Sequence, residues 1–402
     1  MQKQLPNHPS LVMCLIIMLS PIGQMAIDIY VTALPAMRHD FGVSQQQIQL
    51  SVTAYLLSFA IGQLFYGPLA DAWGRRSTLL FGLGLYLLGS MLLLSTDHFA
   101  LFLAARVVQG LGVACGSVVM KALAPDHFTG KELAHVMTYM VIGWGMGPIV
   151  APVLGAQLQI HWGWQSCLYF LLAYGAVLFL MVFFGLKESL KKTVPLKLKL
   201  IIENSQMIYA NREFQLCFLI MGLCYGVLLS FNLCAPFMVQ DVLHRSPVFF
   251  GNVALAMGGA YFSGVFSNRI IAGRIAAARL CCSAAMINIF TSIVMVALAL
   301  QWGLNLFSLI IPTLLITFFS GVIFPNMMAR SVSMYPALAG LASSLLGFSL
   351  TLCAGLVMYL SSLLPIDSLL PLALLYLFIA ISSGAMLFRI YRAEPVLALK
   401  SA

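Results

Sequence analysis

Long apolar runs, separated by short polar segments, dominate the pattern along this chain. A run of about 20 apolar residues with few charges predicts an α-helix that crosses a bilayer. Six such runs precede a long polar stretch and six follow it, which predicts an all-α membrane protein with twelve transmembrane helices. The runs lie at 11–33, 49–69, 78–96, 99–121, 135–158 and 166–186, and then at 214–237, 248–270, 278–300, 305–328, 338–362 and 369–391.

The longest polar stretch, residues 187–213, separates the two sets of six and is rich in lysine. Its composition predicts a solvated linker that includes some helix at the membrane surface. The predicted organisation is an N-terminal six-helix half at 1–186, a cytoplasmic linker at 187–213 and a C-terminal six-helix half at 214–402.

Lysine and arginine positions predict the orientation, because positively charged loops are retained in the cytoplasm. With the N-terminus inside, the cytoplasmic loops and tails hold 18 of the 21 Lys and Arg residues, and the outer loops hold only Arg38 and Arg245. This bias predicts that both termini are cytoplasmic and that the chain is a multi-pass protein of the cell inner membrane. The run at 11–33 is predicted to be a retained span rather than a cleaved signal peptide.

The two sets of six also look like copies of one unit. Segment 67–76 (GPLADAWGRR) joins the second and third runs, and segment 264–269 (GVFSNR), followed by Gly273-Arg274, joins the eighth and ninth. Six spans return the chain to the same face of the membrane, so the copies are predicted to be parallel repeats. Transporters use this plan to place a substrate site between two halves.

Composition excludes a water-soluble globule. Hydrophobic residues make up 61% of the chain, charged residues 8%, and the mean hydropathy is +0.98, whereas a soluble domain carries about 25% charged residues. The lipid bilayer is therefore the expected surroundings. The net charge of +9 lies in short loops and not on one basic face, so no nucleic-acid partner is predicted. The cysteines show no metal-ligand spacing and are predicted to be apolar filler.

Asp28 is the only one of the twelve Asp and Glu residues that lies within an apolar run. An acid inside the membrane costs at least a few kcal/mol, so it is a functional candidate. A gate that changed its exposure to water would also change its protonation, which predicts a role in proton coupling. The alternative is a carboxylate near the outer helix end, wetted by headgroup water, because Pro35 follows only seven residues later.

Arg106 is the only basic residue well inside an apolar run, and Gln109 follows it on nearly the same helix face. An arginine stays charged in lipid and needs a carboxylate, a carbonyl or cavity water as a partner. Both a structural clamp and a functional relay are open interpretations for Arg106.

Run 135–158 combines closely spaced glycines with two prolines. Small residues four apart allow two helices to touch backbone to backbone, and each proline removes a backbone hydrogen bond and kinks a helix. Either a bend at the interface between the halves or plain packing would explain the pattern. The residues concerned are Gly143, Gly147, Pro148, Pro152 and Gly155.

Polar and aromatic side chains inside the spans are candidates for a substrate cavity. The chain has 22 Met and 27 Phe residues, and such a lining suits varied amphiphilic ligands because methionine repacks easily. The candidates are Tyr30, Tyr55, Gln109, Tyr139, Asn232 and Tyr261.

Four segments in chain order resemble signatures of the major facilitator superfamily, and the similarity covers essentially the full length. Segment 67–76 resembles the family's loop between helices two and three, in which Asp and Arg form a charge-relay latch at the cytoplasmic gate. The resemblance carries this role to Gly67, Asp71, Gly74, Arg75 and Arg76. Segment 106–110 (RVVQG) resembles the helix-four motif, whose arginine is linked to proton transfer.

The other two segments narrow the group within that family. Segment 143–155 resembles the helix-five antiporter motif of exporters, and Asp28-Ile-Tyr30 with Leu34-Pro35 resembles the helix-one motif of the drug:proton antiporters with twelve spans. The chain looks most like the Bcr/CflA-type branch, which is associated with bicyclomycin and chloramphenicol resistance.

The resemblance implies proton-coupled efflux of amphiphilic small molecules by alternating access. It implies a monomer without a metal or cofactor, driven by the proton gradient and coupled through Asp28 and Arg106. Related exporters often carry a second acid earlier in helix one, where this chain has neutral residues such as Ser20 and Gln24. One proton per cycle is therefore expected.

Three other functions are alternatives to the efflux of drugs. The same fold could export an endogenous metabolite or a siderophore, because one acid and one arginine do not make the cavity plainly cation-selective. A membrane enzyme would need a nucleophile or metal constellation, and the chain has no His-Glu-x-x-His, no Gly-x-Ser-x-Gly and no phosphate loop. It is therefore predicted not to be an enzyme. A receptor that does not transport would leave the repeat unexplained.

Overall fold

The computed structural model describes residues 9–190, 198–271, 274–335 and 338–398, which form helices joined by short connections. Twelve helical segments within these residues are long and apolar enough to cross a membrane. The prediction of an all-α protein with twelve spans is confirmed. The chain forms two compact units, Met1–Lys199 and Leu200–Ala402. The predicted linker at 187–213 stays a prediction, because its residues 191–197 lie outside the described part, as does Gly273 of the second repeat segment.

The first unit packs its helices around α5. This helix contacts α3, α4 and α1, while α6 lies along α1 and α7 lies along α4. The elements are α1 (Pro9–Asp28), η1 (Val31–Ala33), α2 (Leu34–Phe41), α3 (Gln45–Trp73), α4 (Arg75–Leu94), α5 (Phe99–His127), α6 (Gly130–Trp162), α7 (Gln165–Leu180) and η2 (Met181–Gly185).

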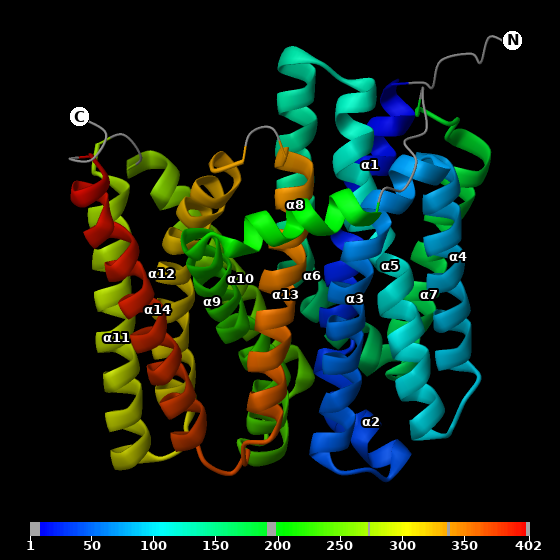
Figure 1. Cartoon of the computed structure of the whole chain (residues 1–402). Coiled ribbons are helices and arrows are strands. Elements are labelled where there is room, and N and C mark those ends of the chain that lie inside the picture. The colour runs from blue at the N-terminus through cyan, green and yellow to red at the C-terminus, as the bar shows by residue number, and fades with distance from the viewer. Residues whose placement is uncertain (1–8, 191–197, 272–273, 336–337, 399–402) are drawn as a thin grey trace, which may run out of the picture. The chain divides into compact units, whose positions relative to one another are not determined.

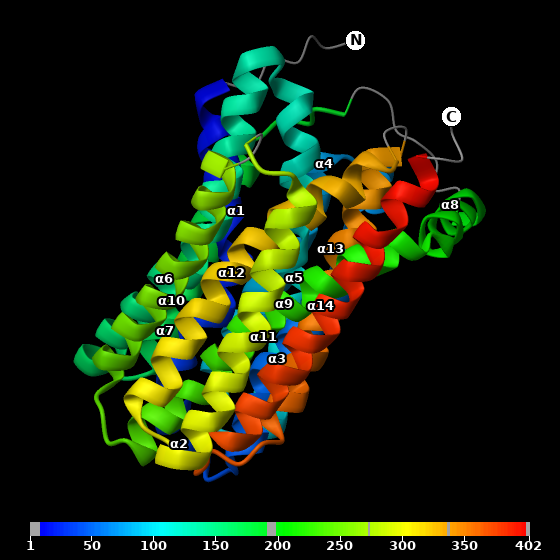
Figure 2. The ribbon, with the colours of Figure 1, turned by 90° about the vertical axis from the view of Figure 1, so that its left-hand side faces the viewer.

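The second unit has α12 at a corresponding position, in contact with α9, α10 and α11. Figure 2 shows α11, α12 and α14 side by side on the face turned to the viewer. Helix α8 runs crosswise to the spanning helices of the second unit in Figure 1. The elements are α8 (Leu198–Ala210), α9 (Arg212–Phe237), η3 (Met238–Val242), α10 (Pro247–Ile271), α11 (Ala277–Trp302), α12 (Leu306–Ser333), α13 (Ala339–Ser362) and α14 (Leu370–Ala398).

The first span is broken at Asp28. Helix α1 ends at this residue, and the span continues to Phe41 through a short turn and α2. Pro35 occupies the second position of α2, where its missing N–H is not needed for helical hydrogen bonding. The predicted run at 11–33 is therefore too short at its C-terminal end. Pro35 was expected to end the span, but it lies in the first turn of α2, which continues it.

The predicted loop at 67–76 is also almost entirely helical. Residues 67–73 complete α3, Arg75 begins α4, and Gly74 alone connects the two helices. Its φ of +94° lies in the region that glycine adopts without steric penalty. The related segment 264–269 likewise lies inside α10. Polar residues at these positions predict a loop, but a helix readily carries them where it leaves the apolar layer.

Candidate functional site

Asp28 is fully buried at the C-terminal end of α1. One turn earlier on the same helix, Gln24 Nε2 donates a hydrogen bond of 2.7 Å to Asp28 Oδ2. Protein atoms and not headgroups surround the carboxyl group, which weighs against a carboxylate wetted at the helix end. A buried acid that keeps a neutral donor as a partner can change protonation without losing its position.

Arg106 is also fully buried and ties α5 to two neighbouring helices. Its Nη2 donates to the backbone oxygen of Ala26 at 3.0 Å, and its Nη1 donates to Gln109 Oε1. Gln109 Nε2 in turn donates to Ser90 Oγ on α4 at 2.9 Å. These bonds agree with the clamp interpretation. Two of them join α5 to α1 and α4, and the bond from Arg106 orients Gln109, which makes the contact with α4.

Two tyrosine rings enclose the Arg106 guanidinium. Its Cζ lies 4.5 Å from the ring centre of Tyr30 and 4.3 Å from that of Tyr55. Such cation–π contacts stabilise a desolvated arginine by up to about 2 kcal/mol each. Tyr55 donates to the backbone oxygen of Gly23 at 2.9 Å, and Tyr30 lies within electrostatic reach of both Asp28 and Arg106. The guanidinium is thus in contact with both rings.

The candidates for the substrate cavity fall into different surroundings. Tyr30, Tyr55 and Gln109 are all fully buried around Arg106. Tyr139 is exposed on α6, while the second unit holds a buried Asn232 on α9 and a half-buried Tyr261 on α10. Their contact with substrate stays a prediction.

No three His, Cys, Asp or Glu side chains come together as ligands of a metal ion in the described part of the chain.

The glycines of α6 face α1 along the stretch that leads to Asp28. A methyl group added at Gly147 would come within 2.7 Å of Gln24 Cβ, and one at Gly155 would overlap the Ile29 carbonyl oxygen. A methyl group at Gly143 would lie 3.1 Å from Ser20 Cβ. Helix α6 is continuous through Pro148 and Pro152. These contacts favour the packing interpretation for the glycines, and the bend stays a prediction.

Gly155→Ala is expected to lower the free energy of unfolding by about 1–3 kcal/mol, the usual penalty of overpacking. The new methyl would push α6 away from the end of α1 that carries Asp28. Thermal unfolding in detergent would measure the effect. Gly259→Ala in α10 is the matched control, because its methyl would meet nothing within 4 Å. Equal behaviour of the two variants would contradict the packing described for α6.

A second polar cluster joins the ends of α3, α4 and α5. Arg75 Nη1 lies 2.5 Å from Asp71 Oδ1, and Arg75 Nε lies 3.2 Å from Asp126 Oδ2. One guanidinium therefore bridges two carboxylates from neighbouring helices. The structure brings the predicted gate residues Asp71 and Arg75 together and adds Asp126 to them.

Glu188, just beyond η2, closes this cluster. Its carboxylate accepts hydrogen bonds from the backbone N–H groups of Arg75 at 2.8 Å and Arg76 at 3.1 Å. A carboxylate at this place satisfies the free N–H groups at the start of α4 and meets the positive end of its dipole. A methyl group at Gly74 would overlap Glu188, so close approach and backbone conformation both require glycine. Arg76 Nη2 also donates to the Phe183 oxygen at 2.8 Å.

The sequence analysis does not identify three residues of these clusters, Gln24, Asp126 and Glu188, as site residues. Gln24 and Asp28 are four apart, a spacing that places them on one helix face, so their contact could have been found. Asp126 and Glu188 carried no comparable local signal. Their partners lie 51 and 113 positions away along the chain, and only the tertiary packing brings them together.

Glu188→Ala is expected to lower the free energy of unfolding by about 1 kcal/mol, as loss of a helix N-cap does. The reason is that two N–H groups at the start of α4 lose their acceptor. The apparent unfolding temperature in detergent would measure the change. Glu203→Ala, at an exposed position of α8, should leave that temperature unaltered. An unchanged temperature for Glu188→Ala as well would refute the capping role.

Comparisons with known proteins agree on one family. The sequence profile of the Major Facilitator Superfamily matches residues 13–358. The chain is 28% identical over 366 residues to multidrug resistance protein D of Escherichia coli (strain K12), covering 87% of this chain and 88% of that protein. It is 27% identical over 362 residues to a bicyclomycin resistance protein homolog of Haemophilus influenzae, covering 85% of each.

A solved structure gives the same fold. The D-xylose-proton symporter matches with a TM-score of 0.74 and 11% sequence identity, covering 95% of this chain and 97% of that one. At this identity the likeness concerns the fold and not the cargo.

Proposed function

Because the chain belongs to the major facilitator superfamily, whose members are membrane transporters, we propose that it exports amphiphilic small molecules in exchange for protons. The observation that carries the proposal is Asp28, an acid buried at a break in the first membrane span. Relatives named for multidrug and bicyclomycin resistance favour foreign compounds as cargo over an endogenous metabolite or a siderophore. The protein acts as a monomer without a cofactor and changes no covalent bond of its cargo.

Asp28 carries the proton in the proposed cycle. When the site opens outward, water reaches the carboxyl group and a proton binds. The neutral acid tolerates burial far better than a carboxylate does, so the empty transporter can return through its closed state. When the site opens inward, Asp28 releases the proton to the cytoplasm and the cargo binds. Gln24 keeps the carboxyl group in position in both protonation states.

Arg106 supplies a fixed positive charge beside this site. Arginine stays protonated, and its hydrogen bonds and flanking rings prevent it from moving toward water. Its hydrogen bond to the Ala26 oxygen, two residues before Asp28 on α1, supports the proposed part of Arg106 in proton coupling. With one acid and one fixed cation, the cycle exchanges one proton for each molecule of cargo.

The cluster of Asp71, Arg75, Asp126 and Glu188 acts as the cytoplasmic latch of this transporter. Positive loops stay inside, and this rule places both termini and the latch on the cytoplasmic face. The latch holds the ends of α3, α4 and α5 together, so the N-terminal half moves as one body during alternating access.

Transport into proteoliposomes tests the proposal. A fluorescent amphiphilic compound should accumulate when a pH gradient is imposed, and a protonophore should stop the accumulation. Accumulation that does not depend on the pH gradient would contradict proton coupling. In a deletion strain, sensitivity to amphiphilic drugs supports export of foreign compounds, whereas build-up of one metabolite without such sensitivity would favour the endogenous cargo.

A further inference from the structure

Helix α12 of the second unit contains a weak turn close to its end. Pro325 lies inside this helix, which is continuous from Leu306 to Ser333. Because proline has no N–H group, the carbonyl oxygen of Gly321 loses its helical hydrogen bond. Glycine adds backbone freedom to the same turn, and bends in helices concentrate at such residues. Residues 321–325 thus form a hinge turn, and residues 326–333 form a short end segment beyond it.

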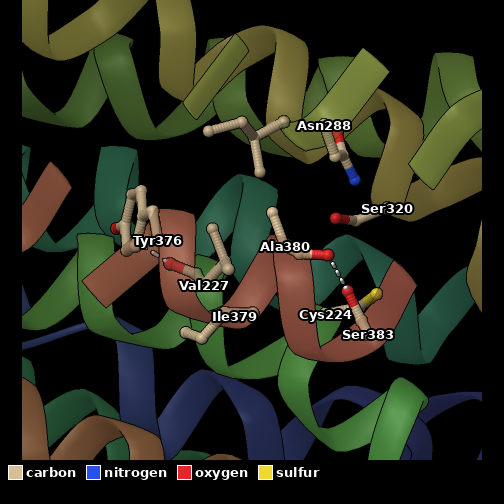
Figure 3. A pocket seen from close by; sticks show the side chains of 9 residues that line it. Cys224, Val227, Asn288, Ser320, Tyr376, Ile379, Ala380 and Ser383 are labelled. Atoms are coloured by element: carbon tan, nitrogen blue, oxygen red, sulfur yellow. Dashed lines mark hydrogen bonds between the residues drawn. The ribbon is translucent and has the colours of Figure 1, made fainter. Parts of the chain in front are cut away.

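Before the hinge turn, uncharged packing fixes α12 to its neighbours. A methyl group added at Gly321 would overlap the Tyr261 oxygen of α10, so the two backbones are in direct contact there. Figure 3 shows Ser320 of α12, Asn288 of α11 and Ser383 of α14 around one small interior space. The side chains described around this space are all uncharged. This part of α12 is therefore held by close packing and not by charge.

A charged side chain holds the end segment. Arg330 Nε donates to Glu213 Oε1 and forms an ion pair with α9. Arg330 Cζ also lies 5.2 Å from the ring centre of Tyr391 on α14, within the range of a cation–π contact. Glu213 lies in the first turn of α9 and Arg330 in the last turn of α12, where the dipole of each helix favours the charge. Arg330 thus ties the end segment to two other helices.

Asn326 adds a neutral contact at the start of the end segment. Its Nδ2 donates to Asn268 Oδ1 of α10 at 2.8 Å and to the Val322 oxygen at 2.8 Å. In the repeated sequence, Asn268 corresponds to Asp71 of the first unit, which forms an ion pair with Arg75. The second unit therefore has an amide contact at the repeated position, and its ion pair with Arg330 lies elsewhere, on the other side of the hinge turn from the packed part of α12.

We propose that the end segment of α12 is a hinged gate element, which Arg330 locks onto Glu213 and Tyr391. Packing fixes the helix up to the hinge turn, so only the residues beyond it move when the ion pair opens. The side chains of Arg330 and Glu213 are 23% and 33% exposed. Opening the pair therefore gives both charges to water and does not strand them in an apolar interior, which keeps the lock reversible. The use of this motion in alternating access rests on the proposed function, whereas the hinge and the lock do not.

Hydrogen–deuterium exchange of the full-length protein in detergent tests the lock without cargo or a pH gradient. Arg330→Gln and Glu213→Gln should each speed amide exchange in residues 326–333 about fivefold, because local opening of the end segment becomes easier. Residues 306–320 should keep their wild-type exchange rate. The double variant should exchange no faster than either single variant, because both remove the same contact. Arg389→Gln, at an exposed position of α14, is the matched control and should leave the exchange unchanged.

Tyr391→Leu removes the ring contact alone and should give a smaller rise at the same residues, so the lock stays testable if an Arg330 variant does not fold. Unchanged exchange of residues 326–333 in the Arg330 and Glu213 variants would overturn the lock. An equal rise along the whole of α12 would overturn the hinge, and additive effects in the double variant would overturn the pairing. Each of these results leaves proton-coupled export untouched, and a failure of gradient-driven transport would leave the lock untouched.

Discussion

Asp28→Asn is expected to abolish transport driven by a pH gradient, to the level of empty liposomes, while substrate binding survives. Asparagine has nearly the same shape as aspartic acid and can still accept a hydrogen bond from Gln24, which donates to Asp28 at 2.7 Å. It resembles the protonated acid but cannot release a proton. The variant should therefore bind cargo more weakly than wild type, because cargo binding is linked to loss of the proton, and it should fail to convert the proton gradient into net movement. Gradient-driven uptake and equilibrium binding, measured on the same preparation, separate the two steps.

Asp97→Asn is the matched control for this experiment. Asp97 is exposed in the connection between α4 and α5, so neutralising it should leave coupled transport at the wild-type rate. The assignment of Asp28 fails if Asp28→Asn keeps its gradient-driven uptake, or if both variants lose it equally.

Arg106→Lys is expected to reduce transport at least tenfold even though the charge is kept. Arginine reaches Gln109 Oε1 and the Ala26 oxygen at the same time, and a lysine ammonium cannot reproduce this planar arrangement. A lost hydrogen bond to a charged group is worth about 1.5–3 kcal/mol, and about 1.4 kcal/mol corresponds to a factor of ten. The substitution would also remove the contacts of the guanidinium with the rings of Tyr30 and Tyr55. Uptake rate and unfolding temperature, measured together, show whether the variant loses transport because the charge is misplaced or because the protein is less stable.

Arg245→Lys serves as the comparison, because Arg245 is exposed after η3 and the substitution there should be silent. Wild-type transport by Arg106→Lys would mean that charge alone matters at this position and that the clamp geometry does not.

The twelve spans were predictable because the bilayer imposes a length on every apolar run. The burial of Asp28 within the first span was predictable for the same reason, since a single acid in an apolar run is visible without any tertiary information. Helix ends were less predictable. Polar residues at the end of α3 and in the first turn of α4 suggest a loop, but the backbone stays helical except at Gly74.

Contacts between segments far apart in the sequence could not be predicted from the local sequence pattern. The approach of Gly147 to Gln24, and of Glu188 to the start of α4, depends on how whole helices pack. Spacing indicated that α6 has a smooth face but not that α1 is its partner. The packing of Tyr30 and Tyr55 against Arg106 could not be predicted either, because an aromatic residue in a span can face lipid, cargo or a charge.

In the proposed cycle, one proton leaves Asp28 when cargo binds. Addition of an amphiphilic substrate to purified protein in weakly buffered detergent solution, followed with a pH indicator over a chemically diverse panel, measures this directly. Wild type should release about one proton for each molecule of cargo bound, as expected when one coupling acid lies in the membrane, and Asp28→Asn should bind cargo and release none. Equal proton release by the two proteins would contradict the claim.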